Sequence, residues 1–388
     1  MITPFTVNID DTLLSDIKKN IEQYQWGYMP DDDSWKYGTN LNYLKKLCAY
    51  WVDSFEWKDQ EKKINAFPQF KTTIDGMSIH FIHLRGSSIE PRPLLISHGW
   101  PGSFVEFLDL LEPLAFPERF GGNSADAFDL IIPSLPGFGF SDRPSLPMGP
   151  RAMANVLNNL MTDALGYDNY FAQGGDWGSA ICSWLGHDFP ENCKAIHINF
   201  PTMRHIDGPQ DEEEQAWSNR VDRESIMEDG YRTLQATRPQ TLSYAMQSNP
   251  VAIAAWIVEK FYSWSDLDNH DLESIHSKDD MLTNIMIYIT TDTFNSSTWI
   301  YYGRREEGGR ILGVNGSRVE VPTGVALFPK ETLAWPPRKY VERMYNINSW
   351  TVMKRGGHFA AMEQPKALMD DMQQFFRNIK IEAFCPAN

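Results

Sequence analysis

The stretch GGDWGS, Gly174–Ser179, decides the fold, because it forms a sharp turn between a strand and a helix. Residues 170–173 (YFAQ) read as the end of a short apolar strand, and the residues that follow Ser179 have the apolar spacing of a helix. In the strand-turn-helix arrangement called the nucleophile elbow, only small residues fit two positions on either side of the apex. Gly174 and Gly178 occupy those positions. Asp176, at the apex, is therefore the predicted nucleophile.

A second segment, PLLISHGWPGSFVEF at Pro93–Phe107, favours this interpretation over an ordinary glycine-rich turn with a helix-capping Asp. It contains a buried-type strand, a turn rich in glycine and proline, and the beginning of an amphipathic helix. In proteins with such an elbow, the loop after this strand and the residue after the nucleophile each supply a backbone N–H to an oxyanion hole. The predicted donors are the amides of Trp100 and Trp177. We interpret His98, in the same loop, as a structural brace.

The general base is expected late in the chain, because the order in this arrangement is nucleophile, acid, histidine. The segment WTVMKRGGHFAAMEQP places His358 in a loop at the end of a strand, where catalytic residues concentrate. The acid should follow the preceding strand, and VPTGVALFPKET supplies Glu331. Glu320 precedes that strand and Glu342 belongs to a charged helical stretch, so both are weaker alternatives. The acid would fix the imidazole tautomer and stabilise the imidazolium.

Taken together, these motifs resemble the microsomal-type epoxide hydrolases, members of the α/β-hydrolase fold, nearly from end to end. The matching segments are PFTVNIDDTLLSDIKKNIEQYQW, LNYLKKLCAYWVDSFEWKDQEKKINAFPQFKTTIDGMSIHFIH, HGWPGSF, GGDWGS, VPTGVALFPKE and RGGHFAAMEQP. The resemblance implies an α/β fold with a mostly parallel central sheet flanked by helices, an inserted helical lid and an N-terminal helical arm. It also implies Asp176 as nucleophile, Glu331 as acid and His358 as base.

The resemblance further implies two lid tyrosines that donate hydrogen bonds to the epoxide oxygen. The segment GYRTLQATRP indicates Tyr231, and SSTWIYYGRRE indicates Tyr301, with the adjacent Tyr302 left as an alternative and as a substrate contact. Phenols can donate to an oxygen that gains charge as the ring opens. Aromatic residues such as Trp100, Trp177 and Trp256 would wall a pocket for a lipophilic substrate.

Organisation along the chain follows from where strands alternate with helices. Residues 1–75 are expected to form the N-terminal helical arm, and residues 76–200 the first part of the core, where the alternation favours a mostly parallel sheet. Residues 201–320 are rich in helical and aromatic patterns and are expected to form the lid. Residues 321–388 complete the core.

Composition limits the classes of partner. The chain has 388 residues, 42% of them hydrophobic, and a formal charge of −16, which disfavours nucleic acid and anionic membranes as partners. No segment has the ~20 consecutive apolar residues that span a bilayer, and the first residues do not resemble a signal peptide. We therefore expect a soluble, cytoplasmic protein whose oligomeric state, a homodimer included, is open. The cysteines have no disulfide or metal spacing and are expected to be free thiols; they are Cys48, Cys182, Cys193 and Cys385.

The predicted activity is hydrolysis of a lipophilic epoxide to a vicinal diol, with water as co-substrate and no cofactor or metal. A carboxylate at the elbow suits attack on an sp³ carbon and leaves a hydrolysable ester, whereas a serine would leave an ether. Asp176 thus argues against a peptidase or lipase. The alternatives are a haloalkane dehalogenase, an epoxide-opening cyclase or isomerase of a biosynthetic pathway, and an inactive binding homologue. Detoxification and secondary metabolism both fit. The lid segment SNPVAIAAW departs from the related DSPxGLAAW-like pattern, so the substrate stays open.

Overall fold

Residues 93–97 (PLLIS) and 129–133 (DLIIP) are almost continuously apolar, and strands of this kind need cover on both faces. In the computed structural model, which describes residues 1–30, 33–90, 92–268 and 270–380, they form the wholly buried strands β4 and β5 of a nine-stranded sheet. From one edge to the other, the strands are β1 (Thr3–Phe5), β2 (Gln69–Ile74), β3 (Met77–Leu84), β5 (Asp129–Pro133), β4 (Pro93–Ser97), β6 (Tyr170–Gly174), β7 (Cys193–Ile198), β8 (Val319–Leu327) and β9 (Tyr345–Val352).

The sheet is mixed. From β5 to β9 every neighbouring pair is parallel, as the alternation of strands and helices predicts. The three strands at the other edge, β1, β2 and β3, run antiparallel to their neighbours. Helices that follow the parallel strands cover the sheet, and α5 packs on α6 while α4 packs on α15. These core helices are α4 (Leu108–Ala115), α5 (Pro150–Asn159), α6 (Asp176–Asp188), α13 (Arg338–Glu342), α14 (Ala360–Glu363) and α15 (Pro365–Arg377).

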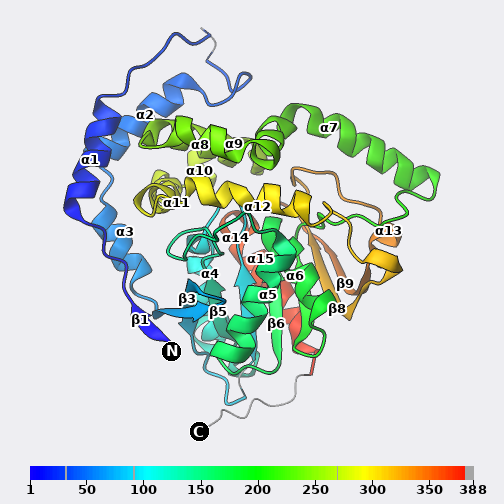
Figure 1. The fold of residues 1–388 in the computed structure, drawn as a ribbon. Helices are drawn as coiled ribbons and strands as arrows, with labels where there is room; N and C mark the ends of the chain where they lie inside the picture. Colours follow the sequence, from blue (N-terminus) through cyan, green and yellow to red (C-terminus); the bar gives the residue numbers. More distant parts are fainter. Residues whose placement is uncertain (31–32, 91, 269, 381–388) are drawn as a thin grey trace.

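A layer of helices is inserted between β7 and β8 and lies across one end of the sheet (Figure 1). Its members are α7 (Glu212–Thr237), α8 (Pro239–Met246), α9 (Pro250–Trp264), α10 (Leu272–Ile275), α11 (Lys278–Thr290) and α12 (Phe294–Glu306). Several of these helices begin with a side-chain cap. Asp211 caps α7, Asn249 caps α9 and Ser277 caps α11, each by accepting a backbone N–H of the first turn. We call this layer the lid.

The N-terminal arm runs along the side of the core and the lid (Figure 1). Its helices are α1 (Asp11–Glu22), α2 (Leu41–Asp53) and α3 (Trp57–Ile64). Helices α1 and α2 contact α9, and the Tyr50 hydroxyl donates a 2.7 Å hydrogen bond to Asp279 of α11. The arm therefore packs mainly against the lid.

The expected boundary of the arm at residue 75 falls in the turn between β2 and β3. Strand β2 lies before that boundary, yet it pairs along its whole length with β3, so a division at 75 would cut a β-hairpin. The connecting residues Asp75 and Gly76 both have positive φ, 50° and 80°, which is the geometry that an Asp-Gly hairpin turn requires. The Asp-Gly pair was thus the sequence signal for this hairpin.

Three of the cysteines, Cys48, Cys182 and Cys193, are buried and free, and Cys385 lies outside the described residues. Within the described ranges, none of the helices combines the length and the apolar character needed to cross a membrane.

Candidate active site

Asp176 lies at the apex of the turn between β6 and α6, with a φ of 45° that non-glycine residues rarely adopt. The two flanking glycines permit this turn. A Cβ on Gly174 would lie 2.3 Å from the carbonyl carbon of Gly178, and a Cβ on Gly178 would lie 2.0 Å from the carbonyl oxygen of Ser97. No larger residue fits at either position. The local geometry is that of the nucleophile elbow.

The loop after β4 approaches the Asp176 carboxylate closely. The Trp100 amide donates a 2.7 Å hydrogen bond to Oδ1 of Asp176, and a Cβ on Gly99 would lie only 2.1 Å from that oxygen. The Trp177 amide belongs to the first turn of α6, where N–H groups lack an intrahelical acceptor. His98 is buried, and its ring nitrogens are within 3.0 Å of the Gly99 carbonyl oxygen and 3.2 Å of the Leu135 amide. Burial lowers the pKa of His98 to about 4, so it is a neutral brace of the loop.

Two loops at the ends of neighbouring parallel strands bring the acid and the base together. Glu331 follows β8 and His358 follows β9, and the His358 Nδ1–H donates a 2.6 Å hydrogen bond to Glu331 Oε1. On the other side of the ring, His358 Nε2 lies 3.4 Å from Asp176 Oδ2. The two alternative acids are engaged elsewhere, because Glu320 pairs with Arg318 and Glu342 pairs with Arg338 in exposed ion pairs.

The electrostatics of His358 depend on both carboxylates. Burial by itself lowers the pKa of the imidazole, but the charge of Glu331 and the hydrogen bond to Asp176 outweigh burial. The pKa of His358 therefore lies well above its usual value. The ring is held as an imidazolium between two carboxylates for as long as Asp176 keeps its charge.

The lid places two phenols opposite the elbow. Tyr231 from α7 and Tyr301 from α12 have ring centroids 5.8 Å apart, and both pack against the Trp100 indole at 5.3 and 5.8 Å. The Tyr301 ring also lies 4.6 Å from that of Trp177. Burial, with a contribution from the nearby Asp176 charge, raises the pKa of both phenols. The two hydroxyls therefore stay protonated and able to donate.

Two of the expected substrate contacts lie elsewhere. Trp256 is not among the residues that line the cavities at Asp176; its indole N–H donates a 3.0 Å hydrogen bond to Gln235 of α7. Trp264, two turns further along α9, occupies that wall instead, with its ring 4.8 Å from His358 and 5.2 Å from Tyr231. Tyr302 does not line either cavity, whereas its neighbour Tyr301 does.

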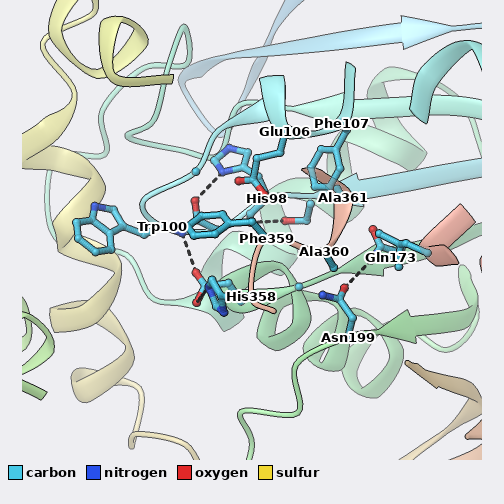
Figure 2. A pocket seen from close by; sticks show the side chains of 16 residues that line it. His98, Trp100, Glu106, Phe107, Gln173, Asn199, His358, Phe359, Ala360 and Ala361 are labelled. Atoms are coloured by element: carbon cyan, nitrogen blue, oxygen red, sulfur yellow. Dashed lines mark hydrogen bonds and ion pairs between the residues drawn. The ribbon is translucent and has the colours of Figure 1, made fainter. Parts of the chain in front are cut away.

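Two cavities meet at Asp176 and His358. The first, of about 20 Å³, lies on the core side (Figure 2) and is large enough for about one water molecule. Its walls include Gln173, whose Oε1 atom is buried without a hydrogen-bond partner among the described residues, and Glu106. Burial, opposed by the His358 charge and supported by the Asp176 charge, raises the pKa of Glu106 to about 8.

The second cavity, of about 50 Å³, lies on the lid side. Asp176, the two phenols and Trp264 form part of its wall, and three arginines form another part: Arg232, Arg304 and Arg310. No group of three or more His, Cys, Asp or Glu side chains in the described part of the chain is arranged to hold a metal ion.

Sequence reasoning missed Glu106 and the three arginines. A signal existed for two of them: Arg232 directly follows Tyr231, and Arg304 lies one helical turn after Tyr301, a spacing that puts two residues on the same face of a helix. Glu106 stands in the HGWPGSFVEF segment as its only acidic residue. For Arg310, which follows α12 in a loop, the sequence offered no signal.

Comparison with known proteins adds independent findings. The family described as "Epoxide hydrolase N terminus" matches residues 2–107, and the "alpha/beta hydrolase fold" family matches residues 92–271. A protein of Stigmatella aurantiaca (strain DW4/3-1) named "Putative epoxide hydrolase" is 39% identical, over 98% of this chain and 86% of its own length. Epoxide hydrolase 1 of Sus scrofa is 36% identical over 96% of this chain and 88% of its own length.

Among solved structures, the juvenile hormone epoxide hydrolase of the silkworm Bombyx mori superimposes with a TM-score of 0.86 at 28% identity. The match covers 97% of this chain and 94% of that chain. The sequence matches extend over nearly the whole chain and the structural match includes arm, core and lid. This chain belongs to the epoxide hydrolase family of the α/β-hydrolase fold.

Proposed function

We propose that the protein is an epoxide hydrolase that converts a lipophilic epoxide into a vicinal diol through a covalent ester on Asp176. The observation that carries this proposal is the pair of protonated phenols, Tyr231 and Tyr301, buried opposite the carboxylate at the elbow. An epoxide between them would meet a nucleophile on one side and two proton donors on the other.

In the first step, Asp176 Oδ2 attacks an epoxide carbon and the ring C–O bond breaks. The ring oxygen leaves as an alkoxide, which is a poor leaving group without help, and it takes a proton from one of the two phenols as its charge develops. Oδ1 stays on the Trp100 amide during this step. The products are an alkyl ester on Asp176 and a tyrosinate.

In the second step, a water molecule in the core-side cavity attacks the ester carbonyl of Asp176. His358 removes the water proton, and Glu331 orients the ring and stabilises the resulting imidazolium. The carbonyl oxygen becomes an oxyanion that the Trp100 amide and the Trp177 amide stabilise, a contribution that is typically about 10²–10³-fold in rate per donor. The acyl C–O bond then breaks, the leaving alkoxide takes the remaining proton of the former water, and the diol leaves behind an ionised Asp176 and a protonated His358.

The charge around His358 fits this order of events. While Asp176 is ionised it raises the pKa of His358, so the ring is protonated and is not a base. Alkylation neutralises Asp176 and removes that influence. The pKa of His358 then falls, and the proton it gives up can go to the tyrosinate. The base thus becomes available in the step that needs it.

Two features weigh against the alternatives. A haloalkane dehalogenase has no leaving oxygen and no need of paired phenols. An epoxide-opening cyclase uses an internal nucleophile, whereas the water-sized cavity adjoins both Asp176 and His358. The aromatic walls of Trp100, Trp177 and Trp264 support a lipophilic substrate. With buried thiols that form no disulfide among the described residues, we place the enzyme in the cytoplasm, in detoxification or secondary metabolism.

The test is intact-protein mass spectrometry of the His358→Gln variant after incubation with lipophilic epoxides. This variant should alkylate but not hydrolyse, so its mass should increase by the mass of the whole epoxide. Asp176→Ala is the control and should gain nothing. Absence of an adduct, together with absence of diol from the wild type, would reject the proposal.

A further inference from the structure

The lid-side cavity has a cationic wall that the proposed chemistry does not use. Arg304 from α12 and Arg310 from the loop after it both line this cavity, and neither guanidinium group makes a hydrogen bond or an ion pair with any of the described residues. Arg304 lies over the Trp177 ring, 4.4 Å from its centroid. Arg232 lines the same wall and is paired with Asp229. We call Arg232, Arg304 and Arg310 the arginine wall.

Guanidinium groups without counter-ions are costly at a partly enclosed site, because the buried charge loses its hydration. This cost lowers the pKa of these groups. Burial, followed by repulsion from the other arginines, lowers the pKa of Arg310 well below its usual value. Burial lowers the pKa of Arg304 to about 10, with repulsion from Arg232 adding to it. The cluster therefore favours binding of an anion.

The carboxylates that line the lid-side cavity are already engaged, Asp176 by the Trp100 amide and His358. Asp229 accepts a hydrogen bond from Arg232, and Glu228 accepts a 3.1 Å hydrogen bond from the Trp264 indole. Glu228 also lies 3.9 Å from the Lys260 ammonium, which itself pairs with Glu259. The fourth arginine of the region, Arg204, donates to the backbone carbonyls of Thr202 and Met203. Of these arginines, Arg304 and Arg310 are left without a carboxylate or a carbonyl oxygen that accepts from their guanidinium groups in the described part of the chain.

The arginine wall is also close to the reacting atoms. Tyr301 and Arg304 are one helical turn apart on α12, and both contact the Trp177 ring, whose centroid lies 4.6 Å from that of the Tyr301 ring and 4.4 Å from the guanidinium. A group that contacts Arg304 while an epoxide contacts Tyr301 must therefore lie within a few bonds of the epoxide ring. A cavity of about 50 Å³ leaves room for a small group only.

We propose that the arginine wall binds an anionic group of the substrate, so that the preferred substrate is an epoxide with a carboxylate a few bonds from the ring. This inference rests on the proposed epoxide hydrolysis. The carboxylate is the smallest anionic group that organic epoxides commonly carry, and two guanidinium groups offer it the forked donors that it binds best. The aromatic walls then hold the apolar remainder.

The experiment compares two matched substrates, 3-phenylglycidate and 3-phenylglycidamide, which differ mainly in the charge of one group. We expect kcat/KM of the wild type to be at least tenfold higher for the acid. Arg304→Gln and Arg310→Gln should each lower the acid-to-amide ratio of kcat/KM by about 10- to 100-fold, the range expected for a charge-assisted hydrogen bond. Arg305→Gln, the same change at an exposed position of α12, should leave the ratio as it is.

A second measurement needs no variant. Cinnamate and cinnamamide cannot be opened, so they report binding alone, and cinnamate should inhibit turnover of a neutral epoxide at least tenfold more strongly. A wild type that hydrolyses the amide without preferring the acid would overturn this inference and leave the proposed function standing. Equal losses for acid and amide in both variants would overturn it too, since the arginines would then act through the phenols. Failure to hydrolyse any neutral or acidic epoxide would reject the proposed function itself.

Discussion

At the scale of single residues, a site position could be predicted where a local rule fixes it. Asp176 follows from the two glycines that its turn requires, and His358 and Glu331 follow from their positions after strands. Glu106 could not be predicted in this way. Its carboxyl group reaches the core-side cavity only because the loop after β4 folds back over the elbow, and a sequence does not show such packing.

The raised pKa of Glu106 makes stability depend on pH. Burial lifts this pKa from its ordinary value near 4.5 to about 8. The contribution of the protonated group to the free energy of unfolding is therefore complete below about 4.5 and is lost as the pH rises through about 8. Glu106→Gln, which resembles the protonated acid, should have the wild-type melting temperature at pH 5 and a higher one at pH 9.

Thermal unfolding followed by circular dichroism at both pH values checks this prediction. Glu112→Gln, an exposed position of α4, is the control and should differ from the wild type by the same amount at pH 5 and at pH 9. If Glu106→Gln behaves like this control, the Glu106 carboxyl is ionised in the native protein at neutral pH.

The two phenols should control the first half-reaction. Tyr231→Phe and Tyr301→Phe should each slow alkylation of Asp176 by about 10²-fold, and the double variant more strongly, because the alkoxide loses its proton donors. Tyr302→Phe is the matched control, since Tyr302 is adjacent on α12 but lines neither cavity. Stopped-flow fluorescence of Trp100 and Trp177, which adjoin Tyr301, measures the rate. Comparable slowing in Tyr302→Phe would contradict this assignment of the donors.

At the scale of elements, the sequence predicted which segments form strands and helices better than it predicted which residues of a helix lie at the cavity. Trp256 and Trp264 stand on the same helix, and the aromatic pattern indicates that α9 faces the site. Only the packing of α9 on α7 decides which turn lies at the cavity, because Trp256 reaches Gln235 while Trp264 reaches Tyr231. Strand β2 was missed because residues 1–75 were all assigned to a helical arm.

The elbow is the element with the least tolerance for change. Gly178→Ala should destabilise the protein by about 1–3 kcal/mol or more, because the new methyl group would lie 2.0 Å from the Ser97 carbonyl oxygen in the core. Gly230→Ala, in the middle of α7 with nothing within 4 Å of the new Cβ, is the control and should be neutral or stabilising. Melting temperatures of the two variants test this prediction. Equal values would contradict it and would show that β4 can move away from α6 to make room for the methyl group.

At the scale of the whole molecule, the site draws on segments that are far apart in the sequence. Asp176 comes from the first part of the core, Glu331 and His358 from the second part, and the phenols and the arginine wall from the lid. For Asp176, Glu331, His358 and the two phenols, the order of the sequence motifs leads to the same division, whereas the arginine wall was not predicted. The sequence did not predict that a chain with a formal charge of −16 has a cationic wall in its active-site cavity, because composition averages over the surface.

One part of the core contributes Asp176 and the other contributes His358. Because the charge of Asp176 changes between the two half-reactions, the two should differ in pH dependence. In the free enzyme, Glu331 and the ionised Asp176 together hold the pKa of His358 well above its usual value, against the effect of burial. Alkylation needs an ionised Asp176 and protonated phenols, whose pKa values burial raises, so its rate constant should stay level across the neutral range. In the ester intermediate Asp176 is neutral, and the pKa of His358 must be lower than in the free enzyme.

Hydrolysis needs neutral His358, so its rate constant should fall about tenfold per unit as the pH drops below the pKa of the intermediate, and the ester should accumulate in acid. Single-turnover stopped-flow measurements between pH 5 and 10 separate the two steps. Glu331→Gln removes the remaining charge that raises the pKa of His358, so its acid limb should shift to lower pH even though the base is weaker. If alkylation and hydrolysis instead fall together in acid, the same proton controls both steps, and the neutralisation of Asp176 does not release the base.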